Sequence, residues 1–449
     1  MYPLAAYPAT VTSAGALRGA LDAAVEGLVG DWVGSLIIST GIVVLFVVAE
    51  TWKRLAKVPT EWTRKLTHLG AGAIVMSFPW LIDSAISALA LALSFGLILV
   101  AGKKTGLLSS VHDVERKTQG AYLYPLAVFG VFMLADGDAL LFCVPLAIMA
   151  VADTGAAIVG KHAGGTRYKV LDGERSLEGS LSFFGIAFAI AIGGLALAGR
   201  PGWPASLLVA LVVAILTTSV EAVSVRGSDN VLIPYAAWIA LERTLDLGLA
   251  GLEPWLVGML CVGTVLAVTW RQAQLTVAGG VTLFLIGSLA YATGGWAWAA
   301  PFYAVYALFL VVRLPRAETD LDEVFATSAG SLVLLLAFSH TGQESLLVPF
   351  LVTVSANAAI LMGTLVWQWS AERGGGRIWS VLRIVGVVIG ALVPAVVSWA
   401  LGLEGHLITI TAGGIVGVVL FRLVEGAAFK GRRLLCSLSV GVLAWAVLG

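Results

Sequence analysis

Long apolar stretches, each close to the roughly 20 residues that a helix needs to cross a bilayer, follow one another along nearly the whole chain. Hydrophobic residues make up 59% of the 449 residues and charged residues only 12%, whereas about a quarter of a soluble domain is charged. The sequence therefore excludes a water-soluble globular protein. It predicts an all-α, polytopic integral membrane helix bundle of about 14–16 transmembrane helices.

The expected spans divide the chain into three parts. Residues 1–31 have no basic segment ahead of an apolar one, and we interpret them as a lead-in rather than a signal peptide. Dense polar clusters mark a first membrane domain at 32–250, and Trp- and Gly-rich spans mark a second helical membrane domain at 251–449. The spans are expected near 32–51, 66–82, 84–101, 121–135, 139–160, 180–198, 205–225, 231–248, 254–269, 275–293, 295–312, 325–340, 345–367, 379–402, 406–421 and 434–449.

Lys and Arg concentrate in every second loop. With the first span running inward, 23 of the 27 basic residues fall in loops on one side, and the others are Arg18, Arg200, Arg243 and Arg383. Because cytoplasmic loops carry an excess of Lys and Arg, this side is predicted to be the cytoplasmic face. The net charge is zero, which gives no reason to expect a nucleic-acid partner.

Two polar clusters lie at that face within predicted spans. Arg64, Lys65 and His68 open the span at 66–82; the two cations suit either a positive-inside anchor or a phosphate site, whereas an imidazole one turn into a span indicates function. Asp153 lies deep in an apolar run, so it is expected to be paired, to bind a cation or to line a wet cavity.

A polar segment follows Asp153 and combines glycines with cations. Backbone N–H groups and cations bind phosphate together, although an ordinary basic loop would also explain the cations. The candidate residues of this segment and of the helix start after it are Gly164, Gly165, Arg167, Lys169, Arg175, Ser176, Glu178 and Gly179.

Glu221, Arg226, Asp229 and Asn230 form a third cluster at the same face. Oxygen ligands of this kind suit magnesium, but a capped turn in which Ser228 or Asp229 starts a helix is the alternative, and we favour it for Asn230. A fourth cluster at 103–117 is expected to be a solvated loop or a lipid-headgroup contact. Carboxylates, cations and glycines on one face are the set that phosphoryl transfer needs, with a lipid alcohol as the natural acceptor.

Four motifs in this order resemble the phytol kinase/dolichol kinase family over about residues 50–240. They are Arg64-Lys65-x-x-His68, Ala152-Asp153-x-x-Ala156-x-x-x-Gly160, Ser176-Leu177-Glu178-Gly179-Ser180, and Glu221 with Asp229-Asn230-x-x-Ile233-Pro234. The resemblance implies a CTP-dependent kinase for an isoprenoid alcohol of the phytol, farnesol, geranylgeraniol or dolichol type, with 153–180 as the CTP-binding region. One departure is Arg175, since the family commonly has Lys before the Ser-Leu-Glu-Gly-Ser stretch.

On this interpretation each candidate has a role. Asp153, Lys169, Glu178 and His68 are the candidate catalytic residues, and Asp153, Glu221 and Asp229 are the candidate magnesium ligands. Nucleotide binding is assigned to Arg64, Lys65, Gly164, Gly165, Arg167, Arg175, Ser176 and Gly179. The alternatives are a CTP-dependent diacylglycerol kinase, a phosphatidate cytidylyltransferase and, from another class, a transporter or scaffold.

The second domain is similar, more faintly, to the membrane family that includes phytyl-phosphate kinases. Where that family would place an Ala-Asp pair, the chain has Ala356-Asn357. Losing the carboxylate removes the charge that a metal needs, so we expect 251–449 to be a degenerate or accessory module. The sequence leaves the oligomeric state open.

Overall fold

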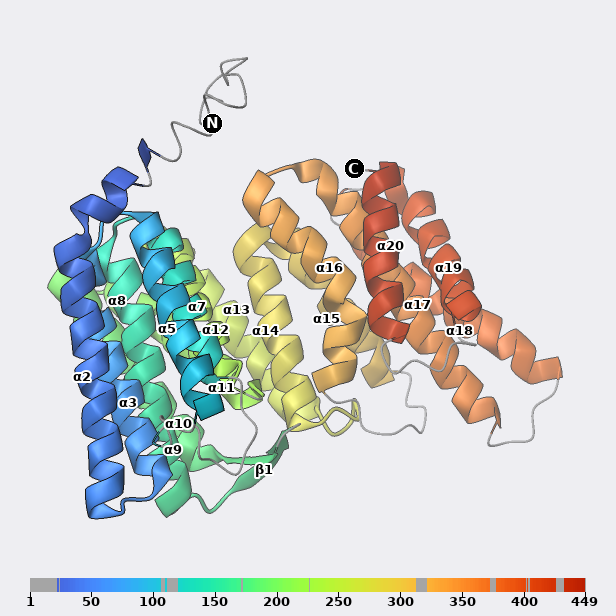
Figure 1. The fold of residues 1–449 in the computed structure, drawn as a ribbon. Coiled ribbons are helices and arrows are strands. Elements are labelled where there is room, and N and C mark those ends of the chain that lie inside the picture. Colours follow the sequence, from blue (N-terminus) through green and yellow to red (C-terminus); the bar gives the residue numbers. More distant parts are fainter. Residues whose placement is uncertain are drawn as a thin grey trace. The chain divides into compact units, whose positions relative to one another are not determined.

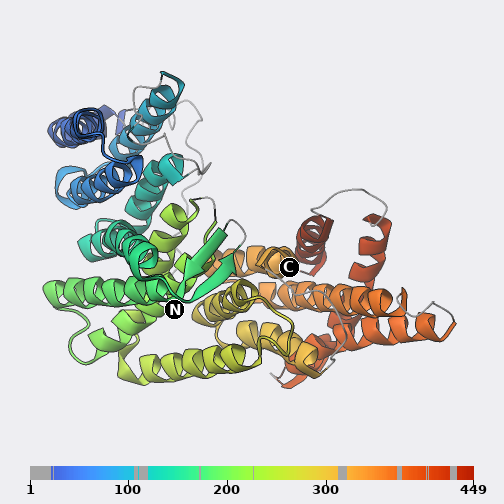
Figure 2. The same cartoon turned by 90° about the horizontal axis from the view of Figure 1, so that it is seen from below.

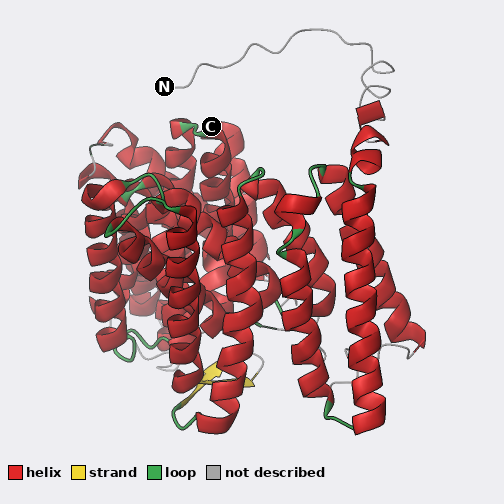
Figure 3. Ribbon diagram, turned by 90° about the vertical axis from the view of Figure 1, so that its left-hand side faces the viewer, coloured by secondary structure: helices red, strands yellow, loops and turns green. Residues whose placement is uncertain are grey.

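The computed structural model describes residues 22–23, 25–105, 110, 120–170, 173–225, 227–311, 321–371, 377–400, 402, 404–424 and 432–448. Nearly all of these residues are helical, and the strands among them form one short hairpin (Figures 1 and 3). The predicted all-α helical bundle is therefore confirmed. Most of the 103–117 cluster and Arg226 lie outside the described residues.

Helices occupy all the predicted spans of the first domain, and a π-helical turn interrupts one of them. The elements are α2 Trp32–Ala56, α3 Thr60–Val75, α4 Phe78–Leu81, α5 Ala85–Thr105, α7 Gly120–Ala135, α8 Ala139–Ala147, the π-helix η1 Ile148–Ala152, α9 Asp153–Ala163, α10 Leu177–Ala198, α11 Ala205–Val223 and α12 Asp229–Thr244.

The remaining elements comprise the hairpin and the helices of the second domain. They are β1 Arg167–Val170, β2 Gly173–Ser176, α13 Gly248–Thr269, α14 Val277–Gly294, α15 Trp296–Val311, α16 Leu321–Thr341, η2 Glu344–Leu346, α17 Leu347–Ala371, α18 Arg377–Ala400, η3 Glu404–His406, α19 Leu407–Val424 and α20 Arg432–Leu448.

Nine helices in the described part of the chain are long and apolar enough to cross a membrane, and five shorter apolar helices accompany them. α3 and α12 belong to neither group, because charged side chains interrupt both. α3 contains Arg64, Lys65 and His68, and α12 begins with Asp229 and Asn230. Both of these charge-interrupted helices thus carry predicted site residues.

The chain forms two compact units, which we describe separately. The first comprises Met1–Gly164 and Glu178–Leu245, and the second comprises Gly165–Leu177 and Asp246–Gly449. The division after Leu245 lies close to the boundary expected near 250. The hairpin groups with the second unit, where β1 packs against α14, although it is joined in sequence to α9 and α10.

In the first unit α2 packs against α3 and α5, and Figure 2 shows these three helices, in blue, grouped together. The buried carboxylate of Asp31 accepts hydrogen bonds from the backbone N–H groups of Asp83 (3.1 Å) and Ser84 (2.9 Å). These donors lie just before α5, so Asp31 ties the start of α2 to the start of α5. α12 packs against α7, α8 and α11, and it also contacts the π-helical turn.

Asp138 holds the outer end of α8. Its carboxylate accepts hydrogen bonds from the N–H groups of Leu140 (2.9 Å) and Leu141 (3.2 Å) and pairs with Arg200. Partial burial disfavours the charged form, but Arg200 and the two N–H groups outweigh burial, so that the pKa of the Asp138 carboxyl lies below its ordinary value. Arg200 is one of the four basic residues outside the predicted cytoplasmic loops, and this ion pair gives it a structural role.

We expect Asp138→Asn to lower the thermal unfolding midpoint at neutral pH. Asn preserves the cap, so the loss reports the ion pair, which at such exposure contributes about 1 kcal/mol or less. Because the folded pKa is lowered, the stabilisation is complete above the unfolded pKa of about 3.9 and disappears as the pH falls through the folded value. The gap between the melts of the two proteins, followed by Trp fluorescence, should therefore begin to narrow near pH 4 and close only once the pH is below the folded pKa; a gap independent of pH would contradict this role.

α17 is the central helix of the second unit and packs against α16, α18, α19 and α20. Asn357 on α17 is buried, and its side-chain amide donates a hydrogen bond to the Ser437 hydroxyl on α20 (3.1 Å). The Gly330 N–H on α16 donates to the same hydroxyl oxygen (2.9 Å). Three helices therefore meet at a neutral polar contact that includes the Asn of the Ala-Asn pair.

Candidate functional site

The first turn of α3 carries an ion pair at the predicted cytoplasmic face. The Arg64 guanidinium donates to the Glu61 carboxylate at 3.0 Å, with both side chains well exposed. Lys65, one residue further along, is 9% exposed. The helix thus turns one cation toward solvent and draws the other into the protein, so Lys65 is more than a solvated anchor.

Glu61 and Lys65 precede the predicted span at 66–82, and burial and neighbouring charges shift the pKa of each. Partial burial alone would raise the pKa of Glu61, but Arg64, Lys65 and Lys161 outweigh it and lower that pKa. Burial lowers the pKa of the Lys65 ammonium, and the charges of Arg64 and Lys161 add to this effect, while Glu61 and Asp153 oppose it. The cations that act here (Arg64, Lys65 and Lys161) outnumber the carboxylates (Glu61 and Asp153). This excess of positive charge favours an anionic ligand.

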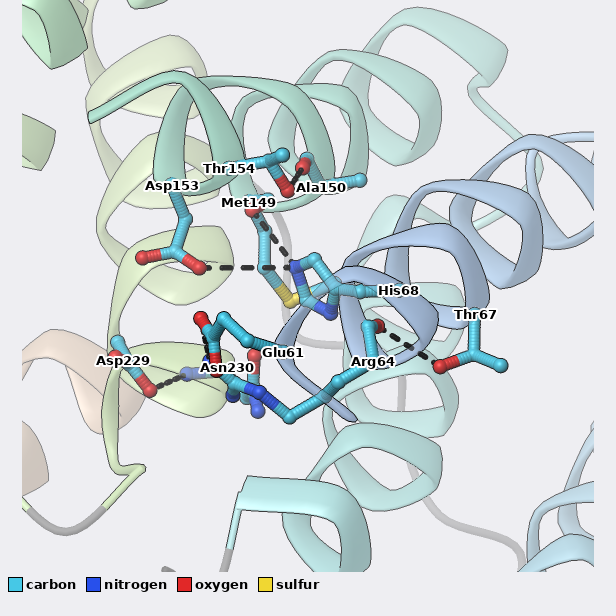
Figure 4. A network of polar contacts seen from close by, with 10 residues as sticks. All are labelled: Glu61, Arg64, Thr67, His68, Met149, Ala150, Asp153, Thr154, Asp229 and Asn230. Carbon is cyan, nitrogen blue, oxygen red and sulfur yellow. Dashed lines mark hydrogen bonds and ion pairs between the residues drawn. The ribbon is translucent and has the colours of Figure 1, made fainter. Parts of the chain in front are cut away.

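His68 lies one turn after Arg64 and reaches the π-helical turn. Its Nε2 is 3.2 Å from the Met149 carbonyl oxygen and 4.0 Å from the Asp153 Oδ2 (Figure 4). Because a carbonyl can only accept, this hydrogen bond requires Nε2 to carry a proton. The Tyr124 ring on α7 also packs against the imidazole in a T-shaped arrangement, with 5.5 Å between ring centroids.

The π-helical turn sets the position of Asp153. Residues 148–152 are wound more widely than an α-helix, and such turns occur mostly as single-turn bulges inside α-helices, frequently at functional sites. Asp153 follows directly as the first residue of α9, and its side chain is 31% exposed. A carboxylate inside an apolar run is therefore open on one side and faces an imidazole on the other.

The start of α12 contributes a second polar group. Figure 4 shows Asp229 and Asn230 at the start of this helix, and the Asp229 carboxylate accepts from the Asn230 backbone N–H (3.0 Å). A Cβ at Gly120, the first residue of α7, would lie 2.6 Å from the Asn230 side-chain nitrogen. Ser228 is the N-cap residue of α12 but makes no side-chain capping hydrogen bond to the helix; its hydroxyl instead accepts from the Val225 N–H in the preceding turn (3.1 Å).

Glu221 lies near the end of α11 and is 4% exposed. The Ser180 hydroxyl in the first turn of α10 donates to its carboxylate at 3.3 Å. This contact joins the Ser-Leu-Glu-Gly-Ser motif to the Glu221 motif, so two of the four predicted motifs meet at this contact. Glu178 and Gly179 belong to the same first turn of α10.

The segment expected to be a basic loop is a β-hairpin. Arg167 pairs in register with Ser176 and Lys169 with Glu174, and Arg167 lies 3.9 Å from the Glu174 carboxylate. Alternation along a strand places Arg167 and Lys169 on one face and Tyr168 on the other. The hairpin groups with the second unit, so we describe the first-unit site without Gly165, Arg167, Lys169, Arg175 and Ser176.

The first unit thus joins the candidate residues in two groups. One contains Lys65, His68 and Asp153, and the other contains Ser180 and Glu221. Within the described residues, no three His, Cys, Asp or Glu side chains come close enough to form a metal site on their own. The magnesium set Asp153, Glu221 and Asp229 remains a prediction, as do the nucleotide-binding roles of Gly164 and Gly179.

Sequence reasoning missed three partners of this site. Glu61 pairs with Arg64, the Met149 carbonyl accepts from His68, and Tyr124 contacts the His68 ring. Glu61 could have been found, since it lies three residues before Arg64 on a helix. Neither a backbone carbonyl exposed by a π-turn nor a tyrosine in an apolar run has a sequence signal of its own.

Comparison with known proteins relates this site to a family. The chain is 32% identical over 209 residues to a phytol kinase from Synechocystis sp., a match that covers 88% of that protein and 45% of this chain. The chain belongs to the phytol kinase family. The match confirms the resemblance as far as a phytol/polyprenol kinase-like family. More than half of the present chain lies outside the match. No family model and no solved structure matches the chain.

Proposed function

We propose that the protein is a CTP-dependent kinase that phosphorylates the hydroxyl of an isoprenoid alcohol at the cytoplasmic face of the membrane. The observation that carries the proposal is the His68–Asp153 pair at the π-helical turn, next to buried Lys65, in a member of the phytol kinase family. The basic character of the loops on one side supports the cytoplasmic location. The choice of CTP rests on the resemblance of the motifs.

In this reaction the alcohol oxygen forms a bond to the terminal phosphorus of CTP, CDP leaves, and the alcohol proton passes to the protein or to water. Asp153 suits the role of proton acceptor because its carboxylate is accessible and lies 4.0 Å from His68. It equally suits a metal ligand. Lys65 and Arg64 provide positive charge for the phosphates, which phosphoryl transfer needs.

Magnesium fits the donor set on chemical grounds. This ion keeps several waters and binds through one or two carboxylates together with substrate phosphates, so a site of three or more protein ligands is not required. Asp153 would hold it, with Glu221 and Asp229 as further candidates. When bound, magnesium would neutralise charge on the phosphates.

The second unit is proposed to be an accessory module without kinase chemistry. Asn357 stands where a carboxylate would be expected, and its amide is already hydrogen-bonded to Ser437 in a buried, neutral contact. A neutral amide contributes no charge toward a cation.

The transporter alternative expects ionisable groups in both halves of the chain, and the buried contact between Asn357 and Ser437 contains none.

A substrate panel tests the proposed function. The full-length protein in liposomes is given CTP or ATP labelled on the terminal phosphate, together with farnesol, geranylgeraniol, phytol, dolichol or diacylglycerol. We expect label transfer from CTP to an isoprenoid alcohol, with CDP as the product. Transfer to diacylglycerol alone would favour the lipid kinase alternative, and pyrophosphate release with phosphatidate would favour the cytidylyltransferase. Folded protein that transfers label to none of them would overturn the kinase assignment.

A further inference from the structure

Tyr124 in the second turn of α7 has a hydroxyl without a partner. Its phenolic oxygen is fully buried and makes no hydrogen bond with any residue that the structure describes. A buried hydroxyl left unpaired costs on the order of 1–3 kcal/mol, and tyrosine hydroxyls usually find a partner when buried. Phe would fill the same apolar position without this cost, so the hydroxyl needs an explanation.

The surroundings of Tyr124 are those of the candidate site. The Tyr124 ring meets the His68 ring edge-on, at an interplanar angle of 73°. A Cβ at Gly72, one turn after His68, would lie 3.6 Å from the Tyr124 hydroxyl oxygen. The Tyr124 ring therefore packs against the imidazole that contacts Asp153, and its unpaired hydroxyl lies near the backbone of Gly72 on the same helix as His68.

The chemistry of an uncharged lipid acceptor matches this arrangement. An alcohol that enters from the bilayer has one polar group, its hydroxyl. The protein must orient this hydroxyl in a site whose cations bind the phosphates of the nucleotide. A phenol donates a hydrogen bond to an alcohol oxygen without competing for phosphate, because it carries no charge at neutral pH. His68 is already engaged through Nε2 with Met149.

We propose that the Tyr124 hydroxyl donates a hydrogen bond to the oxygen of the acceptor alcohol and holds that oxygen beside the His68–Asp153 pair. The proposal rests on the proposed kinase function and names a residue that binds its acceptor. It gives Tyr124 a role in acceptor recognition and leaves nucleotide binding to the cations of α3.

Tyr124→Phe tests this role, because the ring stays and only the hydroxyl is lost. We expect kcat/KM for the alcohol to fall roughly 5- to 100-fold, with the KM for CTP unchanged. Thermal stability should stay equal or rise, since the change removes an unpaired buried group. Tyr235→Phe is the matched control: the Tyr235 hydroxyl on α12 packs against Gly130 further along α7, and its loss should leave the kinetics unchanged.

A second measurement uses the methyl ether of the best alcohol substrate. The ether oxygen accepts a hydrogen bond but has no proton to transfer, so it should inhibit the wild type competitively and inhibit Tyr124→Phe much less. Equal kinetics and equal inhibition in wild type and Tyr124→Phe would overturn this inference while leaving the kinase function intact. A wild type that transfers phosphate to no alcohol would instead overturn the function itself.

Discussion

Asp153→Asn is expected to reduce turnover by roughly 10²- to 10⁴-fold, the range for loss of a group that accepts a proton in the transition state. Asn has nearly the same size as Asp, so the π-helical turn and the His68–Met149 hydrogen bond should persist. The carboxylate is 31% exposed and its distance to His68 is 4.0 Å, so its loss breaks no tight buried ion pair. Initial rates of label transfer in liposomes measure the effect, and the unfolding midpoint should barely move.

Asp83→Asn provides the matched control, because Asp83 is exposed in the connection before α5 at the predicted outer face. It should have wild-type rates. The residual activity of Asp153→Asn also separates the two roles of the carboxylate. A metal ligand predicts that more magnesium restores part of the rate, whereas a proton acceptor predicts the loss of the acidic limb of the pH–rate profile. Turnover equal to the wild type would remove Asp153 from the site.

Gly72→Ala is expected to cause the second large loss, through packing alone. A Cβ at residue 72 would lie 2.6 Å from the Ala150 Cβ, whereas carbon atoms pack at about 3.5–4.0 Å. α3 must therefore withdraw from the π-helical turn by about 1 Å, and a displacement of this size can cost about 100-fold in rate. We also expect a destabilisation of about 1–3 kcal/mol from overpacking. Kinetics and thermal melts of the same preparation measure both effects.

The double variant Gly72→Ala/Ala150→Gly supplies the decisive control, because it moves the methyl group from one helix to the other. We expect it to regain most of the activity lost in Gly72→Ala, which a double-mutant cycle expresses as a coupling between the two positions. Gly96→Ala on α5 should have little effect, since a Cβ there has no neighbour within 4 Å. If the double variant is as impaired as the single one, contact between these two positions does not set the geometry of the site.

The helices could be predicted because a bilayer-spanning helix needs a run of about 20 apolar residues, and such a run is visible in a short stretch of sequence. Every expected span is helical over most of its length, although the span at 66–82 is divided between the end of α3 and α4. The hairpin at 167–176 was not foreseen, since its polar, Gly-containing sequence has no apolar alternation to indicate strands. The hairpin belongs to the second unit because it packs against α14, which lies about 100 residues later in the chain.

The site was predictable only where charge stands out against an apolar background. Asp153 and His68 are conspicuous because ionisable groups within spans are costly, and the structure places them 4.0 Å apart. The contact between Ser180 and Glu221 joins motifs that a sequence can only list in order. Tyr124 and the Met149 carbonyl stayed hidden, because an aromatic residue and a backbone oxygen look the same in a core as in a site.

The π-helical turn has a consequence for how this site can be lost. An α-helix rotates by about 100° per residue, whereas a π-helical turn absorbs one extra residue and keeps the helices on either side in phase. If residues 148–152 rewound into an α-helix without losing a residue, α9 would swing by about 100°, and Asp153 would face away from His68 although every motif residue was still present. The wide winding of this turn is thus as decisive as the identity of its carboxylate, and a relative with one residue fewer here would orient the same carboxylate from an unbroken α-helix.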